Sequence, residues 1–402
     1  MSEGGKAWAG MLAALRLIPG SVWTLGCVSL LMDTSSELIH SFLPVFLVSV
    51  LGAGTLTVGF IEGTAEALAL VTKVFSGVVS DAVGRRKPLV LLGYGLAAAT
   101  KPLFPLAGSV AAVIFARFTD RIGKGIREAP RDALIGDITP PRSSGASFGL
   151  RQALDTLGAI AGPLAAMGCM VLFANNLRAV FWVAVPPAFA AVALLAFGVR
   201  EPAIGQEAQR AYSPIRRDLL MELGPAYWRI VAIGGVFTLA RFSEAFLVLR
   251  ARSVGVPLAL IPLIMVVMNV VYALTAFPAG WRGDNMDRRR LLRLGLVCLA
   301  VADLTLANAV TPAMAYAGAA VWGLHMGLTQ GLFAAMVSDA APARLRGTAF
   351  GVFNLVSGAA LLAASVLAGG LWQEFGPAAT FYTGAGLSIV TMVGVGMVGR
   401  GK

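Results

Sequence analysis

Long stretches without a charged residue constrain this chain more than any other feature. They cover residues 22–32 and 41–60, which one polar cluster separates, and then 102–116, 157–177 and 179–199. Several approach or reach the roughly 20 residues that a helix needs to cross a bilayer. Charged residues make up only 13% of the chain, whereas a soluble domain carries about a quarter. Because so apolar a chain could not maintain a water-facing surface, we expect a membrane protein.

The apolar segments predict an all-α membrane protein with twelve transmembrane helices. The expected spans are 20–50, 56–80, 87–108, 110–136, 146–173, 178–198, 228–250, 257–281, 290–310, 312–338, 347–372 and 377–398. Basic residues such as Arg85 and Arg86 concentrate in alternate connections, while the others hold little beyond Arg178, Arg250 and Arg252. Since basic loops remain in the cytosol, we expect both termini to be cytoplasmic and the protein to lie in a bacterial cytoplasmic (inner) membrane.

A polar stretch near the midpoint divides the chain. Residues 200–222 combine Pro, Gln and charges of both signs, which is typical of a cytoplasmic linker. We expect it to join an N-terminal six-helix bundle (1–199) to a C-terminal one (223–402). The halves echo each other, because Asp137 and Gly149 are twelve residues apart, as are Asp339 and Gly351. Many secondary transporters consist of repeated halves with the substrate site between them, so a central cavity is expected.

The stretch GVVSDAVGRRK, which begins at Gly77, combines glycine, acidic and basic positions at Gly77, Asp81, Arg85 and Arg86. Gly77 permits close helix approach, and Asp81 is suited to cap a neighbouring helix N-terminus. The stretch resembles the signature loop between helices 2 and 3 of the major facilitator superfamily, the twelve-helix secondary transporters. In that family the loop latches the cytoplasmic side shut, so the resemblance implies a gating role. A plain basic loop without such a role is the alternative.

A second motif in the first half resembles the helix-4 motif of the same family. It consists of Arg121 and Gly125 and ends at Asp137. The family's arginine is implicated in proton coupling, which the resemblance implies for Arg121, and Asp137 joins the gating set. This chain has Lys124 where a glutamine is usual. The blocks at 33–37 and 120–132 look like those of a bacterial efflux permease subgroup, to which no substrate can be attached.

A third motif resembles the antiporter motif of helix 5. It consists of Gly158, Gly162 and Pro163, and Met167 departs from the small residue expected at its end. The resemblance implies a gating role for the two glycines and the proline. In the family this motif is found in exporters rather than in uptake proteins. We therefore expect the direction of transport to be outward.

Ionisable side chains inside the expected spans indicate a cavity. Each costs roughly 2.5–3.5 kcal/mol on insertion scales, and such groups usually face an aqueous pathway or one another. Eight of them between Arg117 and Asp132 fall within an arc of about 140° on a helix. Internal salt bridges that only hold the first half together are the alternative. The residues expected to take part in proton coupling are Asp33, Glu37, Glu66, Arg117, Arg121 and Asp155.

Fewer charges lie in the second half, which we expect to shape the substrate pocket. There Arg241 and Glu244 lie about one turn apart on the seventh span. The residues expected to line the substrate cavity are His40, Glu62, Lys124, Arg151, Arg241, Glu244, Asn269, Tyr272, His325 and Gln330.

The chain has two histidines, His40 and His325, one in each half. Our main interpretation is that each is a pore-lining or packed residue without a metal. The alternative is that His40, with Glu37 and Glu66, binds a transition metal or relays protons. His325 and Met326 point about 100° apart on a helix, so they cannot easily share one ion. We expect no metal site and no cofactor.

These features predict a secondary active transporter, namely a proton-coupled antiporter that exports a small molecule by alternating access. The chain has no P-loop, no His-Glu-x-x-His and no Ser-His-Asp set, so we do not expect an enzyme. The net charge of +11 lies mostly in alternate loops, which favours lipid rather than nucleic acid as a partner. We expect a monomer that binds its substrate and protons. The alternatives are a carrier for a charged metabolite or divalent metal ion, a lipid flippase and a substrate-sensing receptor.

Overall fold

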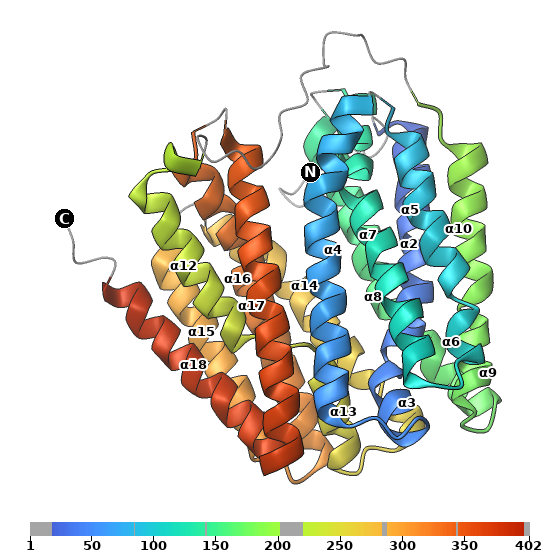
Figure 1. Cartoon of the computed structure of the whole chain (residues 1–402), viewed down its shortest axis with the longest axis vertical. Helices are drawn as coiled ribbons and strands as arrows, with labels where there is room; N and C mark the ends of the chain where they lie inside the picture. The colour runs from blue at the N-terminus through green and yellow to red at the C-terminus, as the bar shows by residue number, and fades with distance from the viewer. Residues whose placement is uncertain are drawn as a thin grey trace, which may run out of the picture.

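The computed structural model describes residues 18–83, 85–140, 143–201, 220–283, 288–342 and 345–397, and all regular elements among them are helices (Figure 1). The first half comprises α2 (Gly20–His40), α3 (Leu43–Ser49), α4 (Thr55–Val83), α5 (Lys87–Thr100), α6 (Leu103–Leu106), α7 (Val110–Ile138), α8 (Ser144–Leu172), α9 (Leu177–Val183) and α10 (Val185–Gly198). The second comprises α12 (Pro225–Ala240), α13 (Ala245–Ser253), the 3-10 turn η3 (Leu258–Leu260), α14 (Leu263–Gly283), α15 (Arg288–Ala307), α16 (Pro312–Ala340), α17 (Arg346–Phe375) and α18 (Pro377–Met397).

The expected all-α membrane fold is confirmed. Eight helical segments in the described ranges are long and apolar enough to cross a membrane. They are α5 with α6, α8, α9 with α10, α12 with α13, η3 with α14, α16, α17 and α18. The other long helices, α2, α4, α7 and α15, are the remaining candidates for the twelve expected spans.

Four of the expected spans are each divided into two α-helices, and a fifth, 257–281, begins with the 3-10 turn η3. Breaks follow α2, α5 and α9, and each is accompanied by proline near the start of the next segment, such as Pro44 in α3 and Pro102 before α6. Proline lacks the amide hydrogen that a helix interior needs. The fourth break separates α12 from α13 at residues 241–244, where no proline is present.

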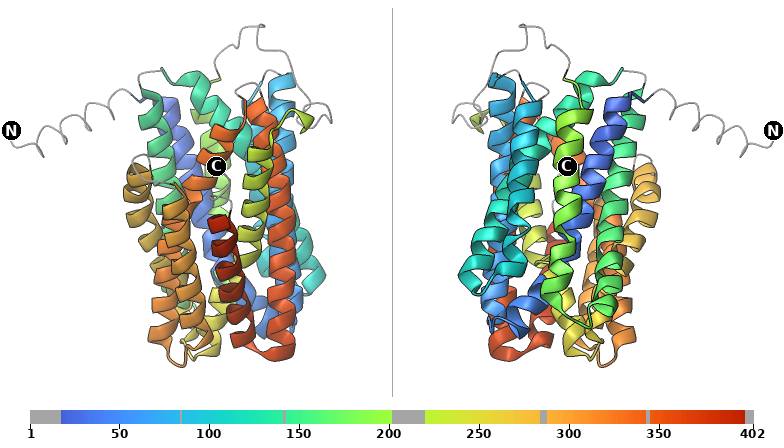
Figure 2. Two further views of the ribbon diagram at one scale, coloured as in Figure 1. Left: turned by 90° about the vertical axis from the view of Figure 1, so that its left-hand side faces the viewer. Right: turned by 90° about the vertical axis from the view of Figure 1, so that its right-hand side faces the viewer.

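The most extensive contacts between the halves are those of α4 with α17 and of α8 with α14, and α13 also packs on α3. Glycines allow the first pair to approach closely near the Thr55 end of α4. A side chain at Gly369 would come within 2.9 Å of the Leu56 Cα atom, and one at Gly63 within 3.0 Å of the Leu362 Cα atom. Figure 1 shows α4 and α17 diverging toward their other ends, and Figure 2 shows the bundle from two further sides. The halves are therefore packed together at the end that carries α3 and α13.

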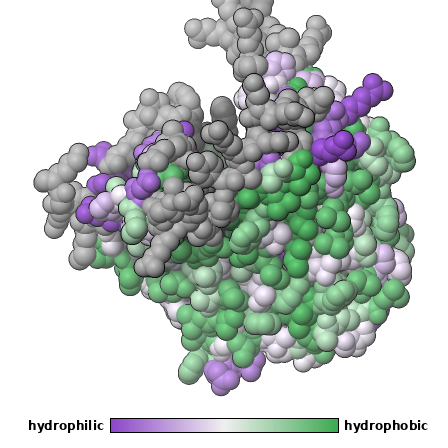
Figure 3. Space-filling view, turned by 45° about the horizontal axis from the view of Figure 1, so that its top comes forward, coloured by the Kyte–Doolittle hydropathy of each residue, from purple (hydrophilic) through white to green (hydrophobic). Residues whose placement is uncertain are grey.

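Large apolar side chains cover the outside of the bundle (Figure 3). Phe197 is 90% exposed, Leu172 76% and Phe375 75%. A monomeric soluble protein rarely exposes apolar patches of this extent, so this surface faces lipid.

Several expectations fall outside the described residues. The expected linker at 200–222 is described at residues 200–201 and 220–222 only, and the termini at 1–17 and 398–402 are not described. The cytoplasmic position of the termini and the division into two bundles joined by a linker therefore remain predictions.

Candidate functional site: a charged cavity between the halves

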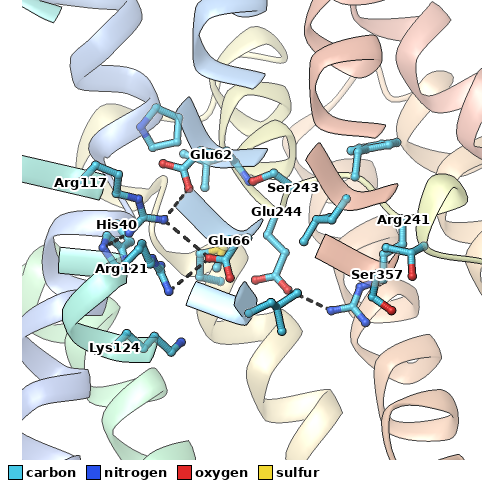
Figure 4. Close-up of a pocket in the computed structure, with 18 of the residues that line it drawn as sticks. His40, Glu62, Glu66, Arg117, Arg121, Lys124, Arg241, Ser243, Glu244 and Ser357 are labelled. Atoms are coloured by element: carbon cyan, nitrogen blue, oxygen red, sulfur yellow. Dashed lines mark hydrogen bonds and ion pairs between the residues drawn. The ribbon is translucent and has the colours of Figure 1, made fainter. Parts of the chain in front are cut away.

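A cavity of about 420 Å³ lies between the two halves (Figure 4). Charged side chains from α2, α4 and α7 form one wall, and residues around the α12–α13 break form the other. The ionisable residues that line it are Glu37, His40, Glu62, Glu66, Arg117, Arg121, Lys124, Arg241 and Glu244. Gln330, Phe237, Phe242, Met265 and Ser357 are among the other lining residues.

A compact ion-pair network forms the first-half wall. The Arg117 Nη2 atom lies 2.5 Å from the Glu62 carboxylate and 3.9 Å from that of Glu66. Arg121 Nη1 lies 3.2 Å from Glu66, and Arg121 Nη2 lies 3.3 Å from the Nδ1 atom of His40. Arg117 also contacts the other ring nitrogen of His40. Each arginine is largely buried, and a buried charge requires such partners because it has lost its hydration.

The shape of α7 explains why these arginines reach the cavity. Arg117, Arg121 and Lys124 recur at i, i+4 and i+7, which places them on one face of a helix. Gly123 and Gly125 lie about 160° apart, one on each side of this basic face. A Cβ atom at Gly123 would lie 2.7 Å from the Gly93 carbonyl oxygen of α5, and one at Gly125 would lie 2.6 Å from a carbonyl oxygen of α4. The glycines thus let α7 pack tightly while its basic face remains toward the cavity.

Glycine packing also positions the acids of α2. Gly158 and Gly162 of α8 lie against α2, and their missing side chains leave room for two α2 residues. A Cβ atom at Gly162 would be 2.7 Å from the Cβ of Glu37, and one at Gly158 would be 2.9 Å from the Cβ of Asp33. The motif that resembles the family's antiporter motif therefore holds Glu37 at the cavity wall.

A second pair lies behind the wall. The Lys101 ammonium is fully buried, 2.8 Å from the Asp120 carboxylate and 2.9 Å from the Ser36 hydroxyl. The other Asp120 oxygen lies 3.8 Å from His40. The sequence interpretation did not single out Lys101, although one cation between two apolar runs was a usable signal.

The second-half wall is less charged. The Arg241 guanidinium lies 3.9 Å from the Glu244 carboxylate, and both residues belong to the break between α12 and α13. Phe237 and Phe242 contribute apolar surface beside them. At 3.9 Å this pair is looser than the Arg117–Glu62 pair, whose atoms are 2.5 Å apart.

Two of the residues expected in proton coupling lie outside the cavity lining. Asp33 lies 3.9 Å from Arg127. Asp155 lies 2.7 Å from Arg151 and 3.8 Å from Arg131. These pairs form a second cluster between α2, α7 and α8. Arg151, expected in the substrate cavity, belongs to this cluster instead.

Three more expected cavity residues also lie elsewhere. Asn269 donates from Nδ2 to the Ala159 carbonyl oxygen at 3.3 Å and so bridges α14 and α8. Tyr272 packs against the central hydrophobic core. His325 is completely buried with Nδ1 2.8 Å from the Gly295 carbonyl oxygen. The two histidines do not meet, and among the described residues no three His, Cys, Asp or Glu side chains are placed to hold a metal ion.

Among the expected gating residues, Arg86, Asp81 and Asp137 form a cluster at the connection between α4 and α5, whereas Gly158, Gly162 and Pro163 lie within α8. Arg86 lies 2.5 Å from Asp137 and 3.3 Å from Asp81. The Asp81 side chain is 56% exposed, and Gly77 packs on Ala129, to which an added Cβ would be 3.5 Å. This cluster is remote from the closely packed glycines of α4 and α17. Asp81 therefore contacts its own half in this conformation.

Comparisons with known proteins agree with this architecture. The Major Facilitator Superfamily profile matches residues 25–250 and 242–400. An uncharacterized MFS-type transporter of Methanocaldococcus jannaschii is 32% identical, with 94% of each chain covered. The inner membrane transport protein YajR of Escherichia coli is 24% identical over 93% of this chain and 83% of its own. The multidrug resistance protein MdtH of an Enterobacter strain is 29% identical over 35% of this chain and 36% of its own.

Solved structures show the same fold. A nucleoside transporter, NupG, superimposes with a TM-score of 0.81 at 12% identity, covering 94% of this chain and all of that one. A peptide transporter, POT, gives 0.78 at 15% identity, with 95% of each chain covered. Such low identity supports the fold alone. With the profile match and the archaeal relative, it follows that this chain is a multi-pass membrane protein that belongs to the major facilitator superfamily, a family of transporters rather than enzymes.

Proposed function

We propose that this protein is a proton-coupled antiporter that exports a small molecule by alternating access, acting as a monomer in a bacterial inner membrane with cytoplasmic termini. The observation that carries the proposal is the position of Glu37. Its carboxylate lines the central cavity, is 24% exposed, and has its described ion pair with His40 at 3.6 Å rather than with an arginine. Glu62 and Glu66, in contrast, lie close to Arg117 and Arg121.

A carboxyl in this position is suited to exchange a proton during transport. Loss of a proton from Glu37 leaves a negative charge that a shift of Arg121 or His40 can offset. Gain of the proton releases those partners to Glu66 and Asp120. Because a carrier moves between two states that differ in these contacts, the proton can bias which state is populated. Arg117 and Arg121 would thus set the proton affinity of the neighbouring acids.

Export, rather than uptake, is supported by two observations. The glycines of the motif at 158–163 pack directly against the α2 acids. One relative with partial coverage is named a multidrug resistance protein. The mixed-charge cavity also fits a polar solute better than an apolar one.

The test compares Glu37→Gln with Glu244→Gln, its counterpart in the second half. Purified variants are reconstituted in proteoliposomes, and pH-gradient-driven transport and energy-independent exchange are measured. Glu37→Gln should abolish gradient-driven export but keep exchange, since Gln preserves shape and removes the titrating group. Glu244→Gln should retain more coupling, because Glu244 pairs with Arg241. Normal coupling in Glu37→Gln would reduce the residue to a structural ion pair and transfer the role to Glu66 or Asp155.

A carrier for a charged metabolite is the second candidate, and Lys124 favours it. Its ammonium lines the cavity, is 37% exposed and lies 3.9 Å from Glu128, so it is free to pair with an anionic substrate. Organic anions should then raise the thermal stability of the purified protein, and Lys124→Gln should remove that effect. The same screen with divalent metal ions tests the metal alternative, for which the described residues offer no three-ligand group.

A further inference from the structure

Asp303 of α15 is a buried acid without a protein partner. Its side chain is completely inaccessible, and neither carboxylate oxygen has a hydrogen-bond partner among the described residues. In the sequence it is the one Asp, Glu, Lys or Arg between Arg293 and Asp339. Ionisable residues within membrane spans are rare and usually functional, and the site described above does not use this one.

The fold provides a niche for this carboxyl group. On α18, Gly384 lies beside it, and an added Cβ there would be 2.6 Å from the Asp303 Oδ2 atom and 3.0 Å from the Phe242 ring. Any side chain at Gly384 would therefore displace the carboxyl group or the ring. Phe242 also lines the central cavity. The Phe242 ring thus lines the cavity and also lies close to the niche of Asp303.

Charged neighbours do not compensate Asp303. The titratable groups on the elements around it include His325 and Tyr316 on α16, Tyr382 on α18 and the Arg241–Glu244 pair at the helix break. Arg250 of α13 lies near the end of α15, where its guanidinium donates to the Leu306, Ala307 and Ala309 carbonyl oxygens. The Tyr316 hydroxyl donates to the Leu260 carbonyl oxygen. His325 contacts the Gly295 carbonyl oxygen, and the Tyr382 hydroxyl donates to the Asn308 side chain at 2.7 Å. Each of these groups therefore has another described partner.

We propose that Asp303 is a second proton-binding site of this transporter, that it carries a proton in the conformation described here, and that Phe242 closes it off from the cavity. An isolated carboxylate moved into an apolar medium loses hydration worth many kcal/mol, whereas the neutral acid loses far less. The niche contains no described cation that would offset a negative charge. This inference rests on the proposed function, because it assumes that the transporter is coupled to protons.

The break between α12 and α13 supplies a way to open the site. Phe242 lies in this break at residues 241–244, and its ring packs on those of Phe246, Trp322 and Phe381. The following amide, that of Ser243, donates to the Ser365 hydroxyl of α17 at 3.2 Å. Interrupted helices at the midplane are typical sites of movement and ion binding in transporters. A change at the break would move Phe242 and admit cavity water to Asp303.

Infrared spectroscopy of the full chain in lipid nanodiscs at neutral pH tests the proton. The spectrum of the unaltered protein minus that of Asp303→Asn should show the carbonyl band of a protonated carboxyl group. A difference that shows an ionised carboxylate instead overturns the proposal. If Asp303→Asn does not fold, Asp303→Glu serves in its place, because the band should then move to the position of a protonated glutamic acid.

The gate is tested by the rate at which this band shifts in deuterated water. Phe242→Leu should accelerate the shift about tenfold or more, because opening the niche becomes easier. Phe246→Leu is the matched control, since Phe246 is equally buried in the same aromatic cluster but does not line the central cavity. Equal rates in the two variants would refute the gate.

Failure of this inference can be told apart from failure of the proposed function. The band that Asp303→Asn removes must persist in Glu37→Gln. A persistent band together with normal coupling in Glu37→Gln would refute the role of Glu37 and leave the Asp303 site standing. Absence of the Asp303 band together with lost coupling in Glu37→Gln would refute the Asp303 site and support the role of Glu37.

Discussion

The Lys101–Asp120 pair offers the sharpest test of how the first half is held together. Both side chains are almost completely buried, at 0% and 4% exposure, with 2.8 Å between the ammonium and the carboxylate. The substitution Lys101→Met keeps the length of the side chain and removes its charge. It leaves Asp120 with His40 at 3.8 Å as its nearest other ion-pair partner and also removes the bond to Ser36.

The expected cost follows from the burial. Removing one member of a buried pair costs about 3–5 kcal/mol, because the remaining buried charge loses its closest partner without regaining its hydration. Lys101→Met and Asp120→Asn should each lower the free energy of unfolding by about this amount. Independent effects would sum to about 6–10 kcal/mol in the double variant. Because the double variant buries no unpaired charge, we expect it to be no less stable than either single one.

The assay is a double-mutant cycle of equilibrium unfolding in mixed detergent micelles, with the four proteins compared under one condition. The Ser36→Ala variant is the control for the lost hydroxyl contact and should cost only about 0.5–1.5 kcal/mol. Additive losses in the double variant, or single losses below about 1 kcal/mol, would refute the reasoning. Either result would mean that water or another group already solvates these charges.

Three further predictions test the topology, the gating cluster and the contact between the halves. A reporter fused after Lys402 should behave as cytosolic and one inserted near Asn175 as external; an external C-terminal reporter contradicts the twelve-span topology. Asp81→Asn should leave folding nearly intact yet slow transport, because its contacts are expected to differ between the two states; unchanged transport kinetics and unchanged accessibility of both cavity faces would exclude that role. Gly369→Val should separate α17 from Leu56 of α4 and increase labelling, from the α3–α13 end, of a cysteine introduced in place of Ser357 in the cavity lining; labelling equal to that of the Ser357→Cys protein with Gly369 intact would show that this contact does not close the cavity.

Much of the fold could be predicted because lipid leaves few choices. A spanning backbone must satisfy its hydrogen bonds internally, so apolar length translates directly into helices. The breaks within the spans could not be predicted from apolar length. The break at 241–244 contains no proline, and its cause lies in tertiary contacts such as that of Ser243 with Ser365. Hydropathy records none of these contacts, so 228–250 was expected to be one continuous helix.

The charged wall of the cavity was predictable in part. Helical periodicity places Arg117, Arg121 and Lys124 on one face of α7, where the structure has them. Periodicity alone does not say which face of a neighbouring helix meets that face, and for this reason Arg151 was expected in the cavity. Its position beside Asp155 depends on how α8 is rotated. That rotation follows from the fit of Gly158 and Gly162 against α2.

The two halves use one packing scheme for different purposes. Asp137 and Asp339 are 202 residues apart, and the same offset relates Gly125 to Gly327. Both glycines allow close helix contact, with α4 in the first half and with Thr275 of α14 in the second. The same offset of 202 matches Arg121 with Gly323, so the counterpart of this buried arginine in the second half carries no charge. Ion pairs break at high cost in lipid, which favours a first half that moves as a unit. Movement within a half would then fall to the second, whose α12–α13 break has no such network and carries the Phe242 ring beside Asp303.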